Sequence, residues 1–314
     1  MRGLPAGFTA RGAVLPDDLD AVADLYAACD RADVGFVDPS RAAIEHDWRA
    51  EGFDPAVDAV VIEAADGRLA AAGTCSWSAD APSDAFNRVH PERRGRGLGT
   101  WLIAWVAERC RANAARGGTP LAYVSLPATD AAGVGLLERH GYAHVRTFRH
   151  LEVDLPGSAP PVPAPEGISI RPVAMPDDLV HVYDVIESAF VGQFDYLPAS
   201  FESRREEWLA TPGFDPELFL LAWDGDRAVG AAVSAPDEGI GWIHEVAVLV
   251  PWRGRGIGEA LLRATFSAFG RRGLQQARLN VDVGNATGAP RLYARVGMHL
   301  RREWLVFEKA FARG

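Results

Sequence analysis

Lysine, cysteine and methionine are scarce in this chain. Lys309 is the one lysine among 32 basic residues, and the 314 residues include three cysteines and three methionines. Cys29, Cys75 and Cys110 form no CxxC pair, and an odd, scattered set argues against a disulfide framework. Each is expected to be a small core residue in a reducing cytosol. Arginine in place of lysine, with abundant alanine, is typical of a GC-rich bacterial genome.

The chain also lacks excess positive charge and long apolar runs. It has 42 acidic against 32 basic residues, a net charge of −10 and a pI near 5.3. That balance argues against a nucleic-acid or anionic-membrane partner. No uncharged run reaches membrane-spanning length, and the first residues lack the apolar core of a signal peptide. The sequence predicts a cytoplasmic monomer or homodimer, and its acidity either suits a cationic substrate or only maintains solubility.

One six-residue string occurs twice, with small changes. Arg94-Gly95-Arg96-Gly97-Leu98-Gly99 is repeated as Arg253-Gly254-Arg255-Gly256-Ile257-Gly258, and each copy follows an apolar run and opens a helical pattern. Strand and helix patterns on either side also restart, so the chain predicts two co-linear α/β units with a mixed, partly parallel sheet. A proline-rich stretch separates them, because proline cannot donate to a sheet. We predict domains at 1–155 and 167–314, joined by a linker at 156–166.

The repeated string has the composition of an anion-binding loop. Its glycines allow a tight turn, and the unpaired N–H groups of the following helix then converge on one point, next to two arginines. A purely structural glycine turn is the alternative. The spacing is GxGxG rather than GxGxxG, and no Gly-Lys-Ser/Thr is present, which disfavours dinucleotide and Walker loops. His244-Glu245 lacks the second histidine of HExxH, so no metal site is predicted.

These motifs resemble the GNAT acyltransferase superfamily. Its pyrophosphate loop, Arg/Gln-x-x-Gly-x-Gly/Ala, matches both copies, and its C-terminal signature resembles the stretch from Asn285 to Met298, with Leu292-Tyr293 at its centre. The resemblance implies an α/β fold with two tandem acyltransferase domains. It also implies acetyl-CoA as the acyl donor and direct transfer to an amine.

The resemblance further implies which residues hold the donor. The main-chain groups of the strand before the loop bind pantetheine, the loop binds pyrophosphate, and one N–H near Val248 contacts the thioester oxygen. The expected donor-binding residues of the second domain are Ala247, Val248, Leu249, Arg253, Gly254, Arg255, Gly256, Ile257, Gly258 and Asn285. Those of the first domain are Arg94, Gly95, Arg96, Gly97, Leu98 and Gly99.

The catalytic groups are expected in the second domain. Tyr293 occupies the position of the family tyrosine that protonates the departing sulfur, whereas Leu137 stands there in the first domain. The first domain is therefore predicted to be a degenerate copy. Glu245 and Asp282, on neighbouring strands, are the candidate bases that accept the ammonium proton. His244 is expected to face the other side, although a strand bulge would exchange it with Glu245.

The sequence favours an acetyl-CoA-dependent N-acetyltransferase for a primary amine of a small molecule. It does not identify the amine, and antibiotic and amino-sugar acceptors stay open. A non-catalytic acyl-CoA-binding or regulatory protein is the second hypothesis, because one domain already lacks the tyrosine. The acceptor is expected to contact Phe190, Gln193, Phe194, Asp195, Tyr196 and Trp304.

Overall fold

The chain forms two compact units of similar construction. A computed structural model describes residues 3–37, 41–77, 81–155, 163–192, 196–211, 213–237, 239–284 and 289–312. Residues 1–148 together with 302–314 make unit 1, and residues 149–301 make unit 2. The predicted linker at 156–166 lies mostly outside the described residues, which omit 156–162.

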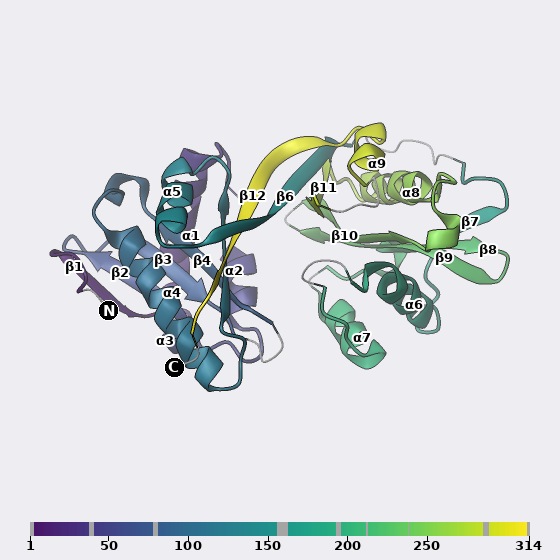
Figure 1. The fold of residues 1–314 in the computed structure, drawn as a ribbon. Helices are drawn as coiled ribbons and strands as arrows, with labels where there is room; N and C mark the ends of the chain where they lie inside the picture. Colours follow the sequence, from purple (N-terminus) through teal and green to yellow (C-terminus); the bar gives the residue numbers. More distant parts are fainter. Residues whose placement is uncertain are drawn as a thin grey trace. The chain divides into compact units, whose positions relative to one another are not determined.

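Unit 1 is a mixed sheet in the order β1-β2-β3-β4-β5-β12 (Figure 1). Neighbouring strands are antiparallel except β4 and β5, which are parallel. Its strands are β1 (Phe8–Gly12), β2 (Ala59–Ala64), β3 (Leu69–Cys75), β4 (Ser83–Val89), β5 (Leu121–Pro127) and β12 (His299–Ala310). Its helices are α1 (Leu19–Asp33), α2 (Arg41–Trp48), α3 (Pro55–Asp58), α4 (Leu98–Ala115) and α5 (Ala131–Arg139).

Alternation along the strands of unit 1 creates two cores. Val60 and Ile62 of β2 pack with α4, whereas Val61 packs with α1 on the opposite face. Successive strand side chains point to opposite faces, so a strand covered by helices on both sides is apolar throughout. This explains why the strand has no polar–apolar alternation in the sequence.

Unit 2 repeats this arrangement in the order β6-β11-β10-β9-β8-β7. β10 and β11 are its parallel pair. Its strands are β6 (Ala143–Asp154, from residue 149 onward), β7 (Ile168–Pro172), β8 (Phe219–Asp224), β9 (Arg227–Asp237), β10 (Ile240–Val248) and β11 (Gln276–Asp282). Its helices are α6 (Leu179–Phe190), α7 (Phe201–Ala210), α8 (Ile257–Arg271) and α9 (Ala289–Arg295).

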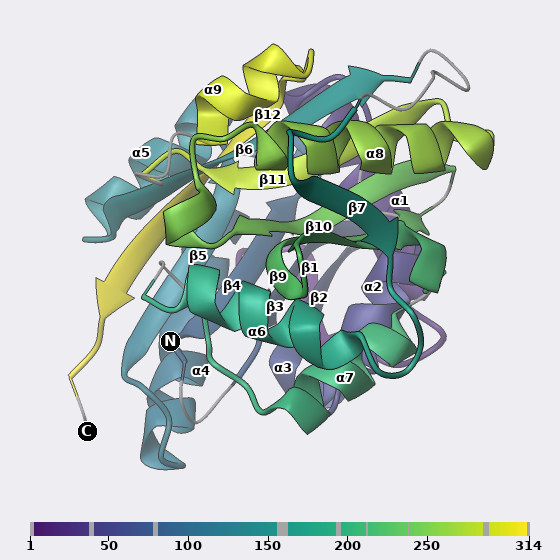
Figure 2. The ribbon, with the colours of Figure 1, turned by 90° about the vertical axis from the view of Figure 1, so that its right-hand side faces the viewer.

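Helices cover both faces of the unit 2 sheet, as Figure 2 shows for α8 on one side and α6 on the other. Leu221 of β8 packs in the core under α6, and its neighbour Leu220 packs in the core under α8. Phe269 of α8 is fully buried and lies against Gly241, where an added Cβ would come within 2.3 Å of the ring. The predicted mixed α/β fold is thereby confirmed.

The last strand of each half of the sequence belongs to the sheet of the other half. β12 pairs antiparallel with β5, and Phe307 is buried in the core of unit 1. Residues 149–154 of β6 belong to unit 2, and Leu151 is buried in its core beside α8. Each unit therefore takes one strand from beyond its own repeat.

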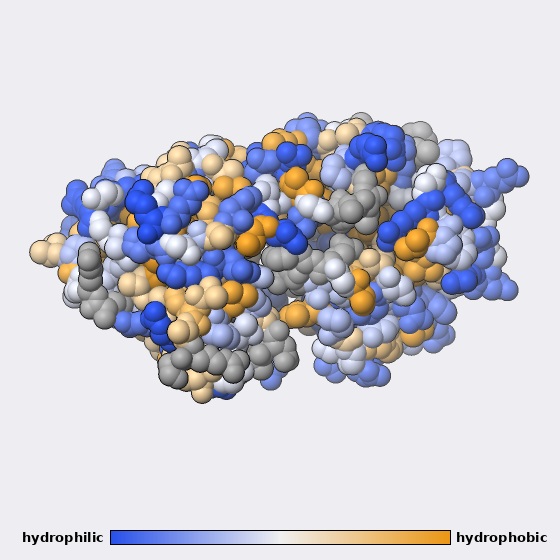
Figure 3. All heavy atoms as spheres, in the orientation of Figure 1, coloured by the Kyte–Doolittle hydropathy of each residue, from blue (hydrophilic) through white to orange (hydrophobic). Residues whose placement is uncertain are grey.

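On the face seen in Figure 3, hydrophilic side chains dominate the surface and apolar ones are scattered. Within the described part of the chain, no helix combines the length and apolar character needed to cross a bilayer.

The strand exchange predicts which unit a core mutation will destabilise. Phe307→Ala should cost about 3–5 kcal/mol of unfolding free energy, because it opens a cavity in the core of unit 1. Hydrogen exchange should then accelerate in β5, not in β11, although β11 is much closer to residue 307 in sequence. Leu151→Ala is the matched control and should accelerate exchange in β11. The reverse pattern would contradict the exchange.

Candidate active site

Both glycine loops adopt the geometry expected of an anion-binding loop, here called the cradle. Gly95 and Gly97 have φ of 75° and 87°, and Gly254 and Gly256 have φ of 77° and 83°. These are left-handed values, which glycine adopts without steric cost. Gly97 and Gly256 are the N-caps of α4 and α8 and offer no side chain to the first turn. The first N–H groups of each helix are left for an external acceptor, where the helix dipole favours an anion.

The third glycine of each loop allows a close helix contact. A Cβ on Gly99 would lie 2.9 Å from Leu136 Cδ2 of α5, and one on Gly258 would lie 3.1 Å from Leu292 Cδ2 of α9. The absence of a side chain lets the second helix of each unit approach the loop. The same approach positions Tyr293, which follows Leu292, in unit 2.

The first arginine of each loop is tied back to the preceding strand. Arg94 Nε donates to Val89 O at 3.3 Å, and Arg253 Nε donates to Val248 O at 2.9 Å. Arg94 also makes a bidentate ion pair with Asp33, at 2.7 and 2.8 Å, which neutralises it. Among the described residues, no carboxylate makes such a pair with Arg253, so the loop of unit 2 keeps more of its positive charge.

The two parallel strand pairs separate at different points. The last residues in register are Phe86 with Ser125 in unit 1 and Ile243 with Leu279 in unit 2. β10 also contains a bulge between Ile243 and Glu245, in its pairing with β9. A bulge adds a residue on one strand and re-aims its side chains. The predicted bulge is confirmed, and it exposes His244 while Glu245 is half-buried.

Glu245 lies among charged side chains of α6 and α7. Burial raises its pKa to about 7, nearby Glu207 and Glu187 act in the same direction, and Arg204 and a hydrogen bond with Trp208 oppose it. Its Oε2 is buried and makes no hydrogen bond within the described structure. A carboxylate that titrates near neutral pH, with one free oxygen, has the properties of a general base.

A polar network surrounds this carboxylate. Tyr196 Oη donates to Glu187 Oε1 at 2.7 Å, and Arg204 Nη1 lies 2.8 Å from Glu207 Oε2. Arg204 Nη2 is 4.0 Å from Glu187, and its side chain is 13% exposed. Three carboxylates thus share one guanidinium, which makes this side of β10 attractive to a cationic amine. Sequence reasoning missed Glu187, Arg204 and Glu207, because the local helix pattern does not link them to a strand residue.

Tyr293 occupies the opposite side of the sheet, on α9. It is 9% exposed, and burial raises the pKa of its hydroxyl to about 12. The phenol therefore keeps its proton at neutral pH and is available as a donor. Leu137 of α5 holds the corresponding place in unit 1 and is 3% exposed. Phe86 and Glu245 likewise stand eight residues before their loop arginines. Unit 1 thus has apolar side chains at both positions.

The remaining predicted residues vary in their placement. Asp282 ends β11, and its Oδ1 accepts a hydrogen bond from Gly284 N at 2.8 Å, which forms a local turn. Phe190 and Tyr196 pack with ring centroids 5.5 Å apart. Asn285 and three predicted acceptor residues lie outside the described residues; those three are Gln193, Phe194 and Asp195.

The expected place of Trp304 in the acceptor pocket of the second domain is wrong. Its ring lies 5.8 Å from Phe86, in unit 1. The reason is the strand exchange, which carries residues 302–310 into the sheet of unit 1. In unit 2, His150 of β6 packs against Trp242 of β10 instead, with centroids 6.4 Å apart.

Comparisons with known proteins agree with this construction. The model of the acetyltransferase (GNAT) family matches residues 19–142 and 180–298. A mycothiol acetyltransferase from Kineococcus radiotolerans is 32% identical over 305 residues, which cover 95% of each chain. One from Geodermatophilus obscurus is 30% identical over 297 residues, covering 90% of this chain and 91% of that one.

Solved structures give the same result. A GCN5-related N-acetyltransferase from Sphaerobacter thermophilus has 35% identity and a TM-score of 0.88, with 98% of this chain and 97% of that one covered. A tandem GNAT protein from the clavulanic acid biosynthesis pathway shares the fold, with a TM-score of 0.71 at 18% identity over 96% of this chain and 98% of that one.

The raised pKa of Glu245 predicts a pH-dependent stability difference. The carboxylate binds its proton more tightly in the folded chain, with a pKa of about 7 against 4.5 for the free group. Stability from this group is therefore lost as the pH rises from about 4.5 through about 7. Glu245→Gln removes the loss and should be more stable than the parent at pH 8 by on the order of 1–3 kcal/mol, with less difference at pH 5. Denaturant unfolding at both pH values measures this, and a pH-independent difference would contradict it.

Proposed function

The chain belongs to the acetyltransferase (GNAT) family, and from that premise we propose that it transfers the acetyl group of acetyl-CoA to the cysteinyl amine of Cys-GlcN-Ins. This is the substrate of mycothiol acetyltransferase. Its support is the similarity at about 30% identity along 95% of both chains to a protein of that name. We therefore favour Cys-GlcN-Ins as the acceptor, which is the activity of a mycothiol acetyltransferase (mycothiol synthase), over the antibiotic and amino-sugar acceptors that the sequence leaves open.

Unit 2 is the proposed catalytic unit. In this proposal the N–H groups from Gly254 to Gly258 bind the donor pyrophosphate, with Arg253 and Arg255 adding positive charge. Pantetheine lies along the separated edge of β10, beside Ala247, Val248 and Leu249. Because β11 leaves this edge unpaired beyond Ile243, main-chain groups there are available to the ligand. A main-chain N–H near Val248 would polarise the thioester carbonyl.

Glu245 is the proposed base and Tyr293 the proposed acid. The ammonium group of the acceptor gives one proton to Glu245, and the neutral nitrogen attacks the thioester carbon. As the C–S bond breaks, Tyr293 gives its proton to the sulfur, and it regains one from the second proton that the nitrogen loses. Glu245 returns its proton to solvent. Asp282 has the lesser proposed role, because its carboxylate already holds a turn.

A non-catalytic acyl-CoA-binding protein is the competing proposal. Its support is unit 1, where Leu137 and Phe86 replace the acid and base while the glycine loop is intact. The two proposals differ in whether any amine is acetylated.

Incubation of the purified chain with acetyl-CoA and Cys-GlcN-Ins tests the proposed reaction. The acceptor carries its own thiol, so the product is best measured as acetylated acceptor by mass spectrometry. We expect stoichiometric acetylation of the amine, and slower reaction with glucosamine as a comparison amine. Acetyl-CoA binding without acetylation of any amine in a broad panel would favour the non-catalytic alternative. Faster acetylation of another amine would overturn the substrate.

Tyr293→Phe tests the proposed acid. Loss of the hydroxyl should lower kcat by about 10²–10⁴-fold, the range typical of a general acid, with a small change in KM for acetyl-CoA. Tyr142→Phe is the matched control, since it removes another buried hydroxyl, 4% exposed and in unit 1. Its turnover should equal that of the parent. An unchanged kcat in Tyr293→Phe would remove this residue from the mechanism.

A further inference from the structure

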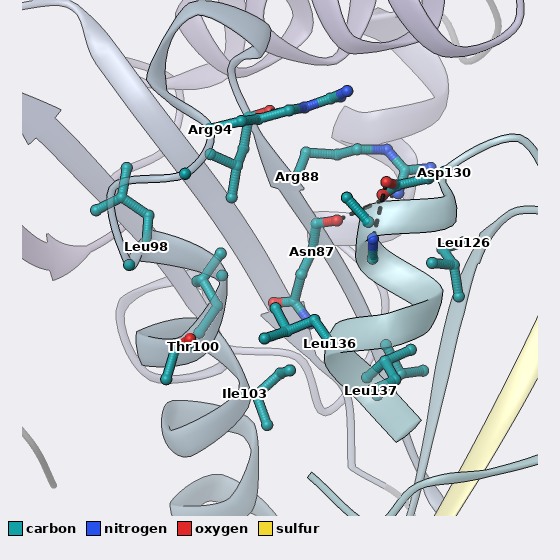
Figure 4. Close-up of a pocket in the computed structure, with 18 of the residues that line it drawn as sticks. Asn87, Arg88, Arg94, Leu98, Thr100, Ile103, Leu126, Asp130, Leu136 and Leu137 are labelled. Atoms are coloured by element: carbon teal, nitrogen blue, oxygen red, sulfur yellow. Dashed lines mark hydrogen bonds between the residues drawn. The ribbon is translucent and has the colours of Figure 1, made fainter. Parts of the chain in front are cut away.

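Unit 1 lacks the proposed acid and base, yet it contains a cavity beside its glycine loop. Its volume is about 430 Å³ (Figure 4). It is lined by Asn87 and Arg88 of β4, by α5, and by the loop residues Arg94, Gly95, Gly97, Leu98 and Gly99. It lies where β4 and β5 separate, next to the N-terminus of the long helix α4. The cavity therefore has an anion cradle at the loop and a second, distinct set of polar groups on the strand.

Arg88 is the unusual member of that set. Its side chain is 4% exposed, yet Nε and Nη2 are buried without a hydrogen-bond partner. Nη1 makes one bond, to Asn87 O at 3.2 Å. The guanidinium lies 4.0 Å from the ring centroid of Phe86 and 4.9 Å from that of Trp304. Cation–π contact offsets part of the desolvation, but donors left unpaired in the interior are costly.

Within the described residues, no carboxylate forms a salt bridge with Arg88. Of the nearby carboxylates, Asp30 has the largest electrostatic effect on Arg88, and its Oδ2 lies 3.8 Å from Arg302 Nη1. Asp33 is already paired with Arg94. Burial raises the pKa of Cys29 to about 11, so its thiol adds no negative charge. The Nε and Nη2 donors that Arg88 leaves unpaired suit a carboxylate, which accepts two parallel N–H···O bonds from a guanidinium.

The Asn87 side-chain amide also lacks a hydrogen-bond partner. Its Oδ1 and Nδ2 are both buried with no hydrogen-bond partner among the described residues. Figure 4 shows Asn87 inside the cavity and the Arg88 side chain running from β4 toward the end of α5 at Asp130. Asp130 Oδ1 caps α5 through Gly133 N at 2.9 Å, and no salt bridge joins Asp130 to Arg88 within the described residues. Native proteins rarely leave so many neighbouring polar atoms unpaired without a ligand.

We propose that the cavity of unit 1 binds a coenzyme A thioester whose acyl chain ends in a carboxylate, with Arg88 as the group that recognises the carboxylate. The loop from Arg94 to Gly99 holds the phosphates, and Asn87 bonds to polar groups of the acyl arm. No transfer follows there, because Leu137 and Phe86 supply neither acid nor base. The ligand is retained as a bound effector, independent of the acceptor proposed for unit 2.

Succinyl-CoA and acetyl-CoA are the two probes, used with the full chain because each unit takes a strand from the other half. Hydrogen exchange followed by mass spectrometry reports on unit 1 through peptides that cover β4 and the start of α4. Protection there, titrated against ligand, gives an affinity for unit 1 whatever binds to unit 2. Succinyl-CoA should bind about 10–100-fold more tightly than acetyl-CoA, the effect of one charge-assisted hydrogen-bonded contact.

Arg88→Met should reduce that preference to about onefold by weakening succinyl-CoA alone, since methionine keeps the packing between Phe86 and Trp304. Arg96→Met is the matched control. It removes a loop charge at the phosphate end and should weaken both thioesters equally.

Equal affinities of the parent for the two thioesters, or no protection by either, would overturn the proposal. This comparison needs no variant, so it holds even if Arg88→Met fails to fold. A preference that survives in a folded Arg88→Met would overturn the role of Arg88. None of these results depends on acetyl transfer, so they are distinct from failure of the proposed reaction.

Discussion

The left-handed glycine at the start of α8, and its counterpart before α4, is the constraint on which each unit depends. A strand must end, the chain must reverse, and a helix must begin with its first N–H groups unpaired. Only a residue that adopts φ near 83° does this without strain. With the turn fixed, the helix covers the sheet, its N-terminus faces the separated strands, and the third glycine admits the next helix. The donor site, the core and the place of Tyr293 follow from one backbone conformation.

Conservation of this turn in both units contrasts with divergence of the strands beside it. The bulge before Glu245 widens the opening in unit 2, and the unbulged β4 keeps its pairing to Phe86. Burial raises the pKa of Glu245, and nearby Glu187 and Glu207 act in the same direction, whereas the corresponding region of unit 1 contains Arg88 between two aromatic rings. The same scaffold therefore presents a negative surface in one unit and a buried positive charge in the other. Such a reversal favours different ligands more than it favours two copies of one active site.

Much of this was accessible from the sequence, for physical reasons. Glycines such as Gly256 mark a turn that requires positive φ, so the anion-binding loop was predictable. Apolar strand patterns follow from burial of the strand, so the mixed sheet was predictable as well. The strand exchange was not, because β12 and β6 carry the same apolar pattern whichever sheet they join, and Trp304 was misplaced as a result. The environment of Glu245 was not predictable either. Arg204 comes near it only because α7 packs there, and the spacing of residues along the sequence does not link the two. The burial of Arg88 was equally hidden, because nothing in the sequence distinguishes it from an exposed strand arginine.

The exchanged strands also bear on why a unit without acid and base persists. Phe307 completes the core of unit 1, and Leu151 completes that of unit 2, so each core contains a large side chain contributed by the other half of the sequence. Loss of either half removes an edge strand from the remaining sheet and exposes its unpaired backbone groups. Unit 1 is thus retained for folding whatever it binds. Unit 1 then does not need to acetylate a substrate, and this is compatible with a buried arginine where unit 2 has carboxylates.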